Sequence, residues 1–390
     1  MQNSSITKES CIARFKEIFN RDPKAYVYSP GRINLIGEHV DYQNGIVFPA
    51  AINKYIHGVA ATTQEPLIKV WSSFDHERVL EIKLDQLEPQ RGEDSWINYI
   101  IGVIAQYMKK GAKVGGLEIV FESDLPSGSG MSSSAALEST TALLIESLFN
   151  FTLEPIERAK ACQAAEHEFA GVPCGIMDQI AVNCGTQGHA LMIDCKSLKL
   201  TPFPIPESIA IVVVDTKVKH DLADGQYTKR KLECDEACKV LGVQSLRKAT
   251  LGELNKVKDI LGTTVFRRSR HVISEIIRVK NFAKAMEQND TTKMGALLAE
   301  SHESLKSDFE VSCLELDRLV QIAEKLDAIG SRMMGGGFGG STINLVRRQN
   351  KEQFLEQIKL LHFEMTGNDI DAWILDPVNG AAASNSVDKI

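Results

Sequence analysis

Apolar residues recur at helical or strand spacings along most of the first half of the chain, with short polar turns between them. Spacings of three or four positions indicate helices, whereas alternation or a short continuous apolar run indicates a strand. Strands are predicted at 25–28, 32–36, within 46–70, at 79–84 and at 116–121. Helices are predicted at 4–19, 96–107, 135–149 and 153–170. This mixture of antiparallel strand runs and helices is compatible with an α+β protein but does not select a fold by itself.

A proline-rich stretch at 201–206 separates this half from the next. Three prolines within five positions resist both helix and central strand, so we expect a domain boundary that divides the chain into 1–207 and 208–390. Beyond it the pattern predicts strands at 209–215, 341–347 and 371–375. Helices are expected at 229–240, 268–288, 291–307, 312–328 and 351–365. Nothing in the three helices between 268 and 328 indicates chemistry.

Composition narrows the class of protein. The chain has 390 residues, 43% of them hydrophobic, and a formal net charge of −7, which argues against a nucleic-acid partner. Its longest clean apolar run, at 209–214, is too short to span a bilayer. Acids and lysines among residues 1–20 argue against a signal peptide, and we expect a cytoplasmic protein. The eight cysteines lack paired spacing, which predicts reduced, mostly buried thiols and no zinc site.

The stretch at 125–138, LPSGSGMSSSAALE, carries the strongest chemical signal. Gly128 and Gly130 permit backbone geometry closed to other residues, three serines follow, and a helix is predicted directly afterwards. A helix N-terminus presents unpaired N–H groups and partial positive charge, so it can bind phosphate without a lysine. We therefore predict a nucleotide triphosphate site. The alternative is a Gly/Ser turn in which the serines cap the helix.

A second polar cluster lies at 30–45. The strand predicted before it should end at Pro30-Gly31, and alternation beyond that turn predicts a strand with Arg32 and Asn34 on a polar face lining a cleft. The alternative is a solvated edge strand and hairpin with Asn44-Gly45 as its turn. That alternative explains the turn but not why arginine, glutamate, histidine and aspartate fall within ten positions.

Two further side chains are candidates on local grounds. Asp178 follows Gly175 amid apolar residues, where a carboxylate is costly to bury without a partner, and Arg32 is the partner we propose. Trp96 begins a predicted helix and could stack on an adenine, although a tryptophan of the core is the commoner case.

Glycines cluster again at 335–340. Gly335, Gly337 and Gly340 satisfy the dinucleotide pattern G-x-G-x-x-G, but that fingerprint must follow a strand and open a helix. Because a strand is predicted at 341–347, we reject a dinucleotide site. The glycines indicate instead a backbone that another part of the protein or a ligand approaches closely.

Three stretches together resemble a known family. PGRINLIGEHVDY at 30–42, LPSGSGMSSSAA at 125–136 and GGGFGG at 335–340 are similar, in that order, to the three motifs of the GHMP small-molecule kinases. Within that superfamily the first motif resembles the galactokinase family. CGIMDQ at 174–179 and the pattern W-x-N-Y-x-x-G-V at 96–103 are also similar to galactokinase signatures. The likeness extends from about residue 25 to residue 345.

The resemblance implies an activity and a fold. The reaction is transfer of the ATP γ-phosphoryl group to the anomeric hydroxyl of α-D-galactose, the first committed step of galactose catabolism, with Mg²⁺ required. The fold implied is an N-terminal α+β domain like domain 2 of ribosomal protein S5 and a C-terminal ferredoxin-like domain, with the active site between them. The implied partners are galactose and ATP, and we expect a monomer with no membrane or nucleic-acid contact.

The resemblance also implies roles for individual residues. The catalytic base would be Asp178, beside Arg32, although a loose phosphoryl-transfer state leaves open that Asp178 mainly orients the hydroxyl. The implied sugar-binding residues are Glu38, His39, Val40, Asp41, the Gly175 backbone and Tyr227. The implied ATP-binding residues are Gly128, Ser129, Gly130, Met131, Ser132, Ser133 and Ser134, to which the local argument adds Trp96. The implied Mg²⁺ ligands are Ser134 and Glu166.

Two alternative functions stay open at this point. The first is a kinase for a related sugar such as N-acetylgalactosamine or arabinose, since a pocket excludes a neighbour with one tolerated substituent only weakly. The second is a sensor that binds galactose and ATP without turnover. Galactokinase-like sensors lack the Ser-Ala pair that this chain keeps at Ser134-Ala135. The absence of a Gly-Lys pair also excludes a Walker A loop.

Overall fold

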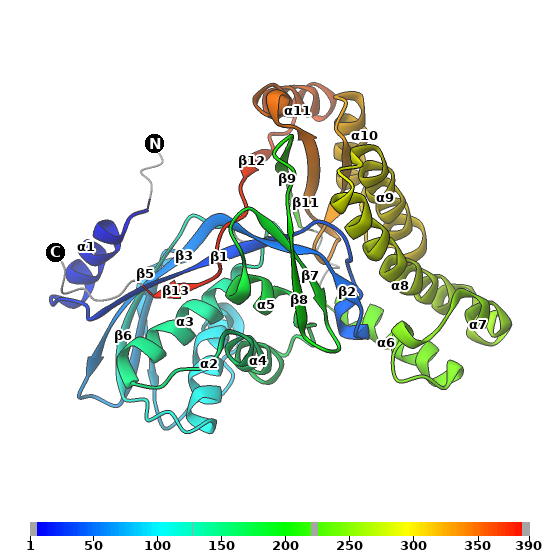
Figure 1. Cartoon of the computed structure of the whole chain (residues 1–390). Helices are drawn as coiled ribbons and strands as arrows, with labels where there is room; N and C mark the ends of the chain where they lie inside the picture. The colour runs from blue at the N-terminus through cyan, green and yellow to red at the C-terminus, as the bar shows by residue number, and fades with distance from the viewer. Residues whose placement is uncertain (1–5, 127, 220–224, 384–390) are drawn as a thin grey trace.

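The computed structural model describes residues 6–126, 128–219 and 225–383. Its N-terminal half is built on a six-stranded sheet with the order β13-β1-β3-β6-β4-β5, in which only β4 and β6 pair in parallel. The strands are β1 (Ala25–Asn34), β3 (Pro49–Thr63), β4 (Leu67–Ser72), β5 (Asp75–Lys83), β6 (Gly116–Ser123) and β13 (Ala382–Ala383). Figure 1 shows β13, near the C-terminus, lying beside β1, so the end of the chain returns to the first sheet.

Helices cover both faces of this sheet (Figure 1). Alternation along β1 sends Tyr26 to the face covered by α1, where it joins Phe15, and sends Val27 to the opposite face and the main core. The helices of this half are α1 (Lys8–Phe19), α2 (Asn98–Lys109), α3 (Ser133–Phe149), α4 (Pro155–Ala165) and α5 (Met177–Cys184). Helix α3 packs directly on β1 and β3, which places the glycine and serine loop before it at the end of the sheet.

The predicted end of the first strand at Pro30-Gly31 is wrong, because β1 runs on to Asn34. The register with β3 shifts between Pro30 and Gly31, where proline lacks the N–H that a regular ladder needs. A side chain at Gly31 would collide with Leu125 and with the Met131 carbonyl. The strand therefore continues past the irregularity and carries Arg32 up to the glycine and serine loop.

The C-terminal half is built on a four-stranded antiparallel sheet with the order β10-β11-β9-β12. Val212 and Val214 of β9 pack under α10 and α11, while Ile211 and Val213 face the main core. The strands are β9 (Ile209–Lys219), β10 (Gly330–Met334), β11 (Gly339–Arg347) and β12 (Asp371–Leu375). The helices are α6 (Gln226–Leu241), α7 (Leu251–Lys256), α8 (Lys258–Glu287), α9 (Thr291–Glu303), α10 (Leu314–Lys325) and α11 (Lys351–Thr366).

A small sheet joins the halves. Its order is β2-β7-β8, made of β2 (Ile46–Val47), β7 (His189–Asp194) and β8 (Lys199–Pro204). The prolines at 202 and 204 lie on β8, which is an edge strand of this sheet, as their missing N–H groups require. The predicted division at 207/208 falls between β8 and β9 and stays a prediction.

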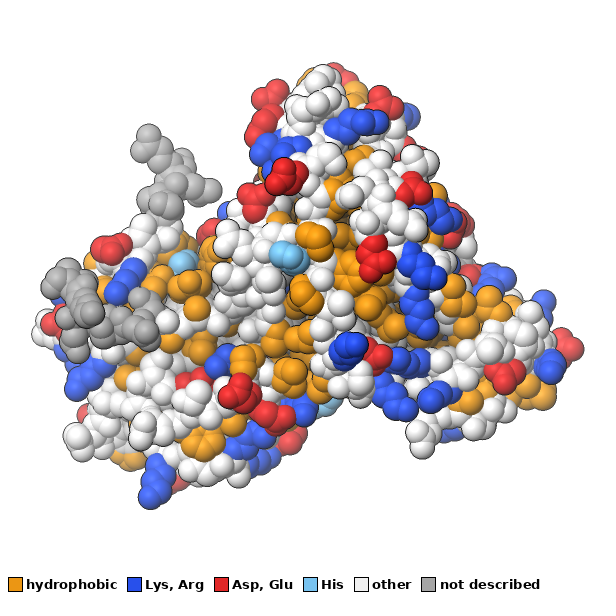
Figure 2. Space-filling view, in the orientation of Figure 1, with side chains coloured by type: hydrophobic (Ala, Val, Ile, Leu, Met, Phe, Trp, Pro, Cys, Tyr) orange, Lys and Arg blue, Asp and Glu red, His pale blue; other side chains and the backbone are white. Residues whose placement is uncertain are grey.

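The α+β class that the family resemblance implies is confirmed, and the eight cysteines are free thiols. None of the helices in the described part of the chain is both long and apolar enough to cross a membrane. On the face shown in Figure 2, acidic and basic side chains are interspersed.

Candidate active site

Four segments that lie far apart in the sequence meet at one small cavity with a volume of about 160 Å³. It is lined by residues of the first motif, by the segment that enters α5, by α6 and by the turn after β10. The predicted site residues that line it are Arg32, Glu38, His39, Asp41, Glu166, Gly175, Asp178 and Tyr227. Val40 does not line it, and its side chain is fully buried in the main core. The remaining lining residues are Val172, Cys174, Met177, Gly335 and Gly336.

The predicted pair between Arg32 and Asp178 is formed. Arg32 donates from Nε to Asp178 Oδ1 at 2.8 Å and from Nη2 to Oδ2 at 2.6 Å, which is the two-pronged geometry that suits a guanidinium and a carboxylate. Ser132 Oγ also donates to Asp178 Oδ2. Arg32 is only 5% exposed; burial opposes its charge, but Asp178 and Glu38 outweigh burial and raise the pKa of Arg32. The Asp178 carboxylate is thus held by three donors at the wall of the cavity.

The loop at 128–134, which leads into α3 (the anion loop), has the form of an anion site. Gly128, Gly130 and Ser132 all have positive φ, at 77°, 73° and 56°, so left-handed residues alternate along it. Alternation of this kind turns successive N–H groups toward one side and makes a concave anion-binding surface. Ser132 is the N-cap residue of α3 but makes no capping hydrogen bond with its side chain, and its hydroxyl donates to Asp178. The alternative of a serine-capped turn is therefore wrong at Ser132.

The glycine cluster at 335–340 spans the turn between β10 and β11 and the start of β11, so a strand follows the glycines as predicted, in place of the helix that the dinucleotide fingerprint requires. It packs directly on the anion loop: Ser341 Oγ donates to the Ser129 carbonyl at 2.7 Å, and Gly130 lies against Met334 and Gly335. Gly337 has φ 84°, and a side chain there would collide with Val311. Two backbone segments approach these glycines closely: the anion loop and the segment at Val311.

His39 occupies an unexpected position. Its φ is 58°, which is rare for a bulky residue and marks local strain. Nε2 lies 3.1 Å from the Gly336 carbonyl and must donate to it, so Nδ1 accepts from Tyr42 Oη at 3.1 Å. Burial lowers the pKa of His39 to about 3, which keeps the ring neutral. In this conformation neither ring nitrogen is free for a sugar hydroxyl, in contrast to the role that the resemblance implies.

Asp41 and Tyr227 complete the opposite wall of the cavity. The Asp41 carboxylate lies directly against Gly175, where any side chain would overlap it. The ring centroid of Tyr227 is 5.3 Å from that of His39 and 5.5 Å from that of Tyr42. Burial, followed by the neighbouring Asp178 carboxylate, raises the pKa of Asp41 to about 7. The ligand-free protein therefore binds a proton at Asp41 more tightly than the unfolded chain does.

This raised pKa predicts that Asp41→Asn stabilises the ligand-free protein at pH 8. A carboxyl with a folded pKa near 7 costs stability progressively as pH rises from about 4 to 7, by on the order of 4 kcal/mol. Thermal unfolding at pH 8 and at pH 4.5 should show a higher melting temperature for the variant at pH 8 and a smaller gain at pH 4.5. Asp194→Asn is the control of opposite sign, because the hydrogen bond from Arg247 lowers the pKa of Asp194. Destabilisation by Asp41→Asn at pH 8 would contradict the assignment.

Acidic oxygens gather beside Asp178. Burial and then the Asp178 charge raise the pKa of Glu166 to about 7, and buried Glu138 has an Oε1 without a partner among the described residues. Gln179 Nε2 bridges the two glutamates, at 2.7 Å from Glu166 Oε2 and 3.2 Å from Glu138 Oε2. Within the described residues, no group of three or more His, Cys, Asp or Glu side chains is arranged to hold a metal. The glutamate carboxylates nonetheless offer hard oxygen donors whose negative charge favours a cation. This fits Mg²⁺, which is held by few protein ligands together with phosphate and water.

Trp96 lies apart from the sugar-sized cavity. It lines a second cavity of about 450 Å³ with Phe74, Asp75, Arg78 and Glu93. The turn that carries Phe74 is tied to the end of β6, since Ser73 Oγ accepts from the Ser123 amide at 3.2 Å. Because the anion loop follows β6, this second cavity opens at the same edge of the sheet as the loop.

The sequence did not indicate that the C-terminal helices and β10 hold the first motif. His271 of α8 donates to the Glu38 carbonyl at 3.1 Å, and Glu275 accepts from the Gly37 amide at 3.0 Å. Arg332 of β10 is fully buried and contacts Leu35 and Glu38. Helix α8 thus supports the first motif through backbone contacts, although none of its residues lines the cavity.

Comparison with known proteins agrees with this arrangement. A family model for the GHMP kinases N terminal domain matches residues 98–186, one for the GHMP kinases C terminal matches 282–361, and the galactokinase galactose-binding signature matches 13–62. A galactokinase of Clostridium acetobutylicum is 38% identical over 381 residues, covering 95% of this chain and 98% of that protein. Human galactokinase is 41% identical over 341 residues, covering 85% and 86%.

Comparison with solved structures shows the same similarity. A Lactococcus lactis galactokinase complexed with galactose superposes with a TM-score of 0.91 at 35% identity, covering 96% of this chain and 99% of that one. A mevalonate kinase superposes at 0.63 with 20% identity, which shows the shared fold alone. The fold and the site thus define a small-molecule kinase of the GHMP class. Within that class, the chain belongs to the galactokinase family.

Proposed function

We propose that this protein transfers the γ-phosphoryl group of ATP to the anomeric hydroxyl of galactose, giving galactose 1-phosphate and ADP. The observation that carries the proposal is the position of the Arg32–Asp178 pair, which lines the small cavity and also touches the anion loop through Ser132 and the Gly130 carbonyl. A hydroxyl in the cavity and a phosphate at the loop would both lie beside this pair. Membership of the galactokinase family supports galactose as the acceptor.

The chain's residues can supply positioning and charge stabilisation, which are most of what phosphoryl transfer needs. The amides of the loop at 128–134 bind the phosphates, Asp178 orients and accepts the proton of the attacking hydroxyl, and Arg32 offsets negative charge on the transferring group. Ser134 at the start of α3 and Glu166 would hold Mg²⁺, which when bound neutralises charge on the phosphate oxygens.

The galactose hydroxyls would be held by Asp41, Glu38, the Gly175 backbone and Tyr227, all of which line the cavity. Carboxylate oxygens accept hydrogen bonds from sugar hydroxyls. His39 contributes packing in place of a hydrogen bond, since both of its ring nitrogens are engaged.

Gly175→Ala should raise the KM for galactose at least tenfold. The added methyl group would overlap the Asp41 carboxylate and force it out of place, while ATP binds elsewhere. Steady-state kinetics should show an unchanged KM for ATP. Gly115→Ala is the matched control, because a methyl group there meets only the Phe149 ring at 3.6 Å. An unchanged galactose KM in Gly175→Ala would remove Asp41 from the sugar site.

Trp96→Ala should raise the KM for ATP roughly tenfold, because a base stacked on an aromatic ring is worth about 1–3 kcal/mol. The KM for galactose serves as the internal control and should stay within twofold. A wild-type KM for ATP in this variant would show that the adenine binds away from the cavity between Trp96 and Phe74.

A coupled assay of ADP release tests the proposal and its alternatives together. We expect galactose to give the highest kcat/KM among galactose, N-acetylgalactosamine, arabinose and glucose. A higher value for another sugar would make the protein a kinase of that sugar, and binding of galactose and ATP without ADP release would make it a sensor.

A further inference from the structure

We propose that Arg332 is a positioning residue for galactose: it orients the Glu38 carboxylate toward the sugar without contacting the sugar itself. This inference rests on the proposed function. Arg332 lies on β10 of the C-terminal half and does not line the cavity, whereas Glu38 lies in the first motif and does.

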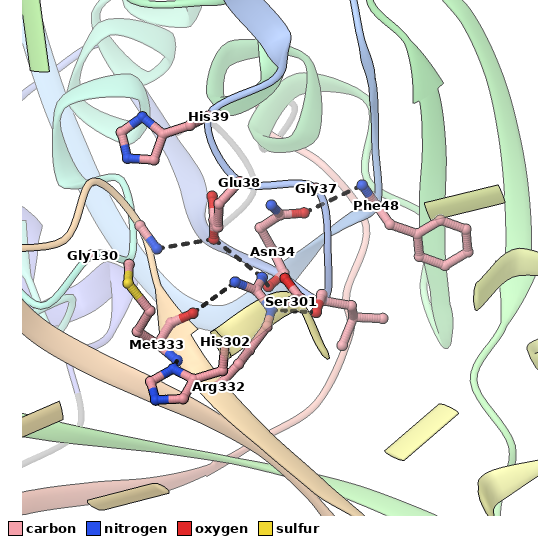
Figure 3. Close-up of polar contacts among 12 residues, drawn as sticks. Asn34, Gly37, Glu38, His39, Phe48, Gly130, Ser301, His302, Arg332 and Met333 are labelled. Atoms are coloured by element: carbon pink, nitrogen blue, oxygen red, sulfur yellow. Dashed lines mark hydrogen bonds and ion pairs between the residues drawn. The ribbon is translucent and has the colours of Figure 1, made fainter. Parts of the chain in front are cut away.

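Arg332 makes a dense set of contacts to the first motif (Figure 3). Nε donates to the Leu35 carbonyl at 2.7 Å, and Nη2 donates both to the Asn34 carbonyl and to Glu38 Oε1, the latter at 3.1 Å. Nη1 donates to the Met333 carbonyl at 2.6 Å. The guanidinium therefore binds the Asn34 and Leu35 carbonyls at the end of β1. The nitrogen that binds the Asn34 carbonyl also binds the Glu38 carboxylate.

The Glu38 carboxylate is held at one oxygen only. Among the described residues, the hydrogen bonds to it come from Arg332 Nη2 and from the Gly335 amide at 2.9 Å, and both end on Oε1. Oε2 accepts neither of these bonds, and the Glu38 side chain lines the cavity. One oxygen is thus fixed by the protein while the other is available to accept from a hydroxyl.

The ion pair between Arg332 and Glu38 is buried. The side chain of Arg332 is 0% exposed and that of Glu38 is 3% exposed. Removing one partner of a buried ion pair leaves an uncompensated charge, which reorganises or binds a proton. Loss of Arg332 should therefore misplace or neutralise the Glu38 carboxylate, which lowers the affinity for the sugar in particular.

The neighbouring contacts distinguish this positioning role from a general role in holding the two halves of the protein together. His271 and Glu275 also hold the first motif, but they bind the Glu38 carbonyl and the Gly37 amide, which are backbone atoms. His302 accepts from the Met333 amide at 3.3 Å and keeps β10 in place. In the described part of the chain, Arg332 is the side chain whose hydrogen bond reaches the Glu38 carboxylate itself.

A double-mutant cycle on galactose affinity tests the proposal. Titration calorimetry would measure the galactose Kd of the wild type, Arg332→Met, Glu38→Gln and the double variant, with the KM for ATP and the melting temperature measured in parallel. We expect Arg332→Met to raise the galactose Kd at least tenfold with the KM for ATP within threefold of wild type. In the Glu38→Gln background the same change should alter the Kd by less than threefold, because its target carboxylate is gone.

Arg158→Met is the matched control. Arg158 is another buried arginine, in an ion pair with Glu146 at 2.8 Å, and its loss should lower the melting temperature without changing the galactose Kd by more than twofold. If Arg332→Met does not fold, Arg332→Lys replaces it; lysine keeps the charge but cannot make the fork of bonds, and we expect at least a threefold rise in Kd that vanishes with Glu38→Gln.

A galactose Kd within threefold of wild type in a folded Arg332→Met protein, or equal effects of Arg332→Met with and without Glu38, would overturn the proposal and leave Arg332 a purely structural residue. If the wild type itself binds no galactose, the proposed function fails instead.

Discussion

Asp178→Asn should lower kcat by about 10²–10³ while leaving nucleotide affinity nearly unchanged. Asparagine keeps the shape of the side chain but loses the charge that faces Arg32 and the second acceptor that receives the hydroxyl proton. The phosphate-binding amides belong to the loop at 128–134 and are not removed. Steady-state kinetics with galactose would measure kcat, and calorimetry with a non-hydrolysable ATP analogue would measure nucleotide affinity.

Asp194→Asn is the control for this variant. Asp194 also accepts two bonds from an arginine, Arg247, but it lies on β7 and does not line the cavity. We expect its kcat to stay within twofold of wild type. Turnover of Asp178→Asn within tenfold of wild type would remove Asp178 from the mechanism.

Arg32→Met should also lower kcat by about 10²–10³ and, unlike Asp178→Asn, should raise the KM for ATP. Arg32 binds the Asp178 carboxylate and also donates to the Gly130 carbonyl in the anion loop. Its loss removes a preorganised positive charge from the transferring group and leaves a loop carbonyl without its donor. The measurement is kcat and both KM values from initial rates at varied galactose and ATP.

The control for Arg32→Met is again Arg158→Met, which removes a buried arginine from an ion pair outside the site. It should lose stability but keep kcat. If both arginine variants lose activity in proportion to their lost stability, Arg32 has no role in the transfer beyond folding.

The strongest features of the site could be predicted from local sequence because their physical causes are local. A carboxylate at 178 amid apolar residues needs a cation, and Arg32 is indeed its partner. Glycines at 128 and 130 before an apolar helix permit an anion loop, because both can adopt the positive φ that the structure shows. The α+β class is different, because the mixture of strands and helices fits it without selecting it, and the resemblance to the GHMP kinases was needed to predict it.

Other features depend on contacts that leave no local signal. Arg332 looks like an ordinary charged residue before a glycine turn, and His271 looks like one of many polar residues on a long helix. Their partners are backbone carbonyls more than two hundred positions earlier. The continuation of β1 through Pro30 was missed because proline and glycine end most strands, whereas here they make room for the anion loop.

The central claim is that a galactose hydroxyl and a nucleotide phosphate meet at the Arg32–Asp178 pair. A crystal structure with galactose and a non-hydrolysable ATP analogue tests it most directly. The account predicts galactose between Asp41 and Asp178, the phosphates on the amides of 128–134, and the anomeric oxygen about 3–3.5 Å from the γ-phosphorus. Ligands far apart from each other, or phosphates bound anywhere other than this loop, would contradict it.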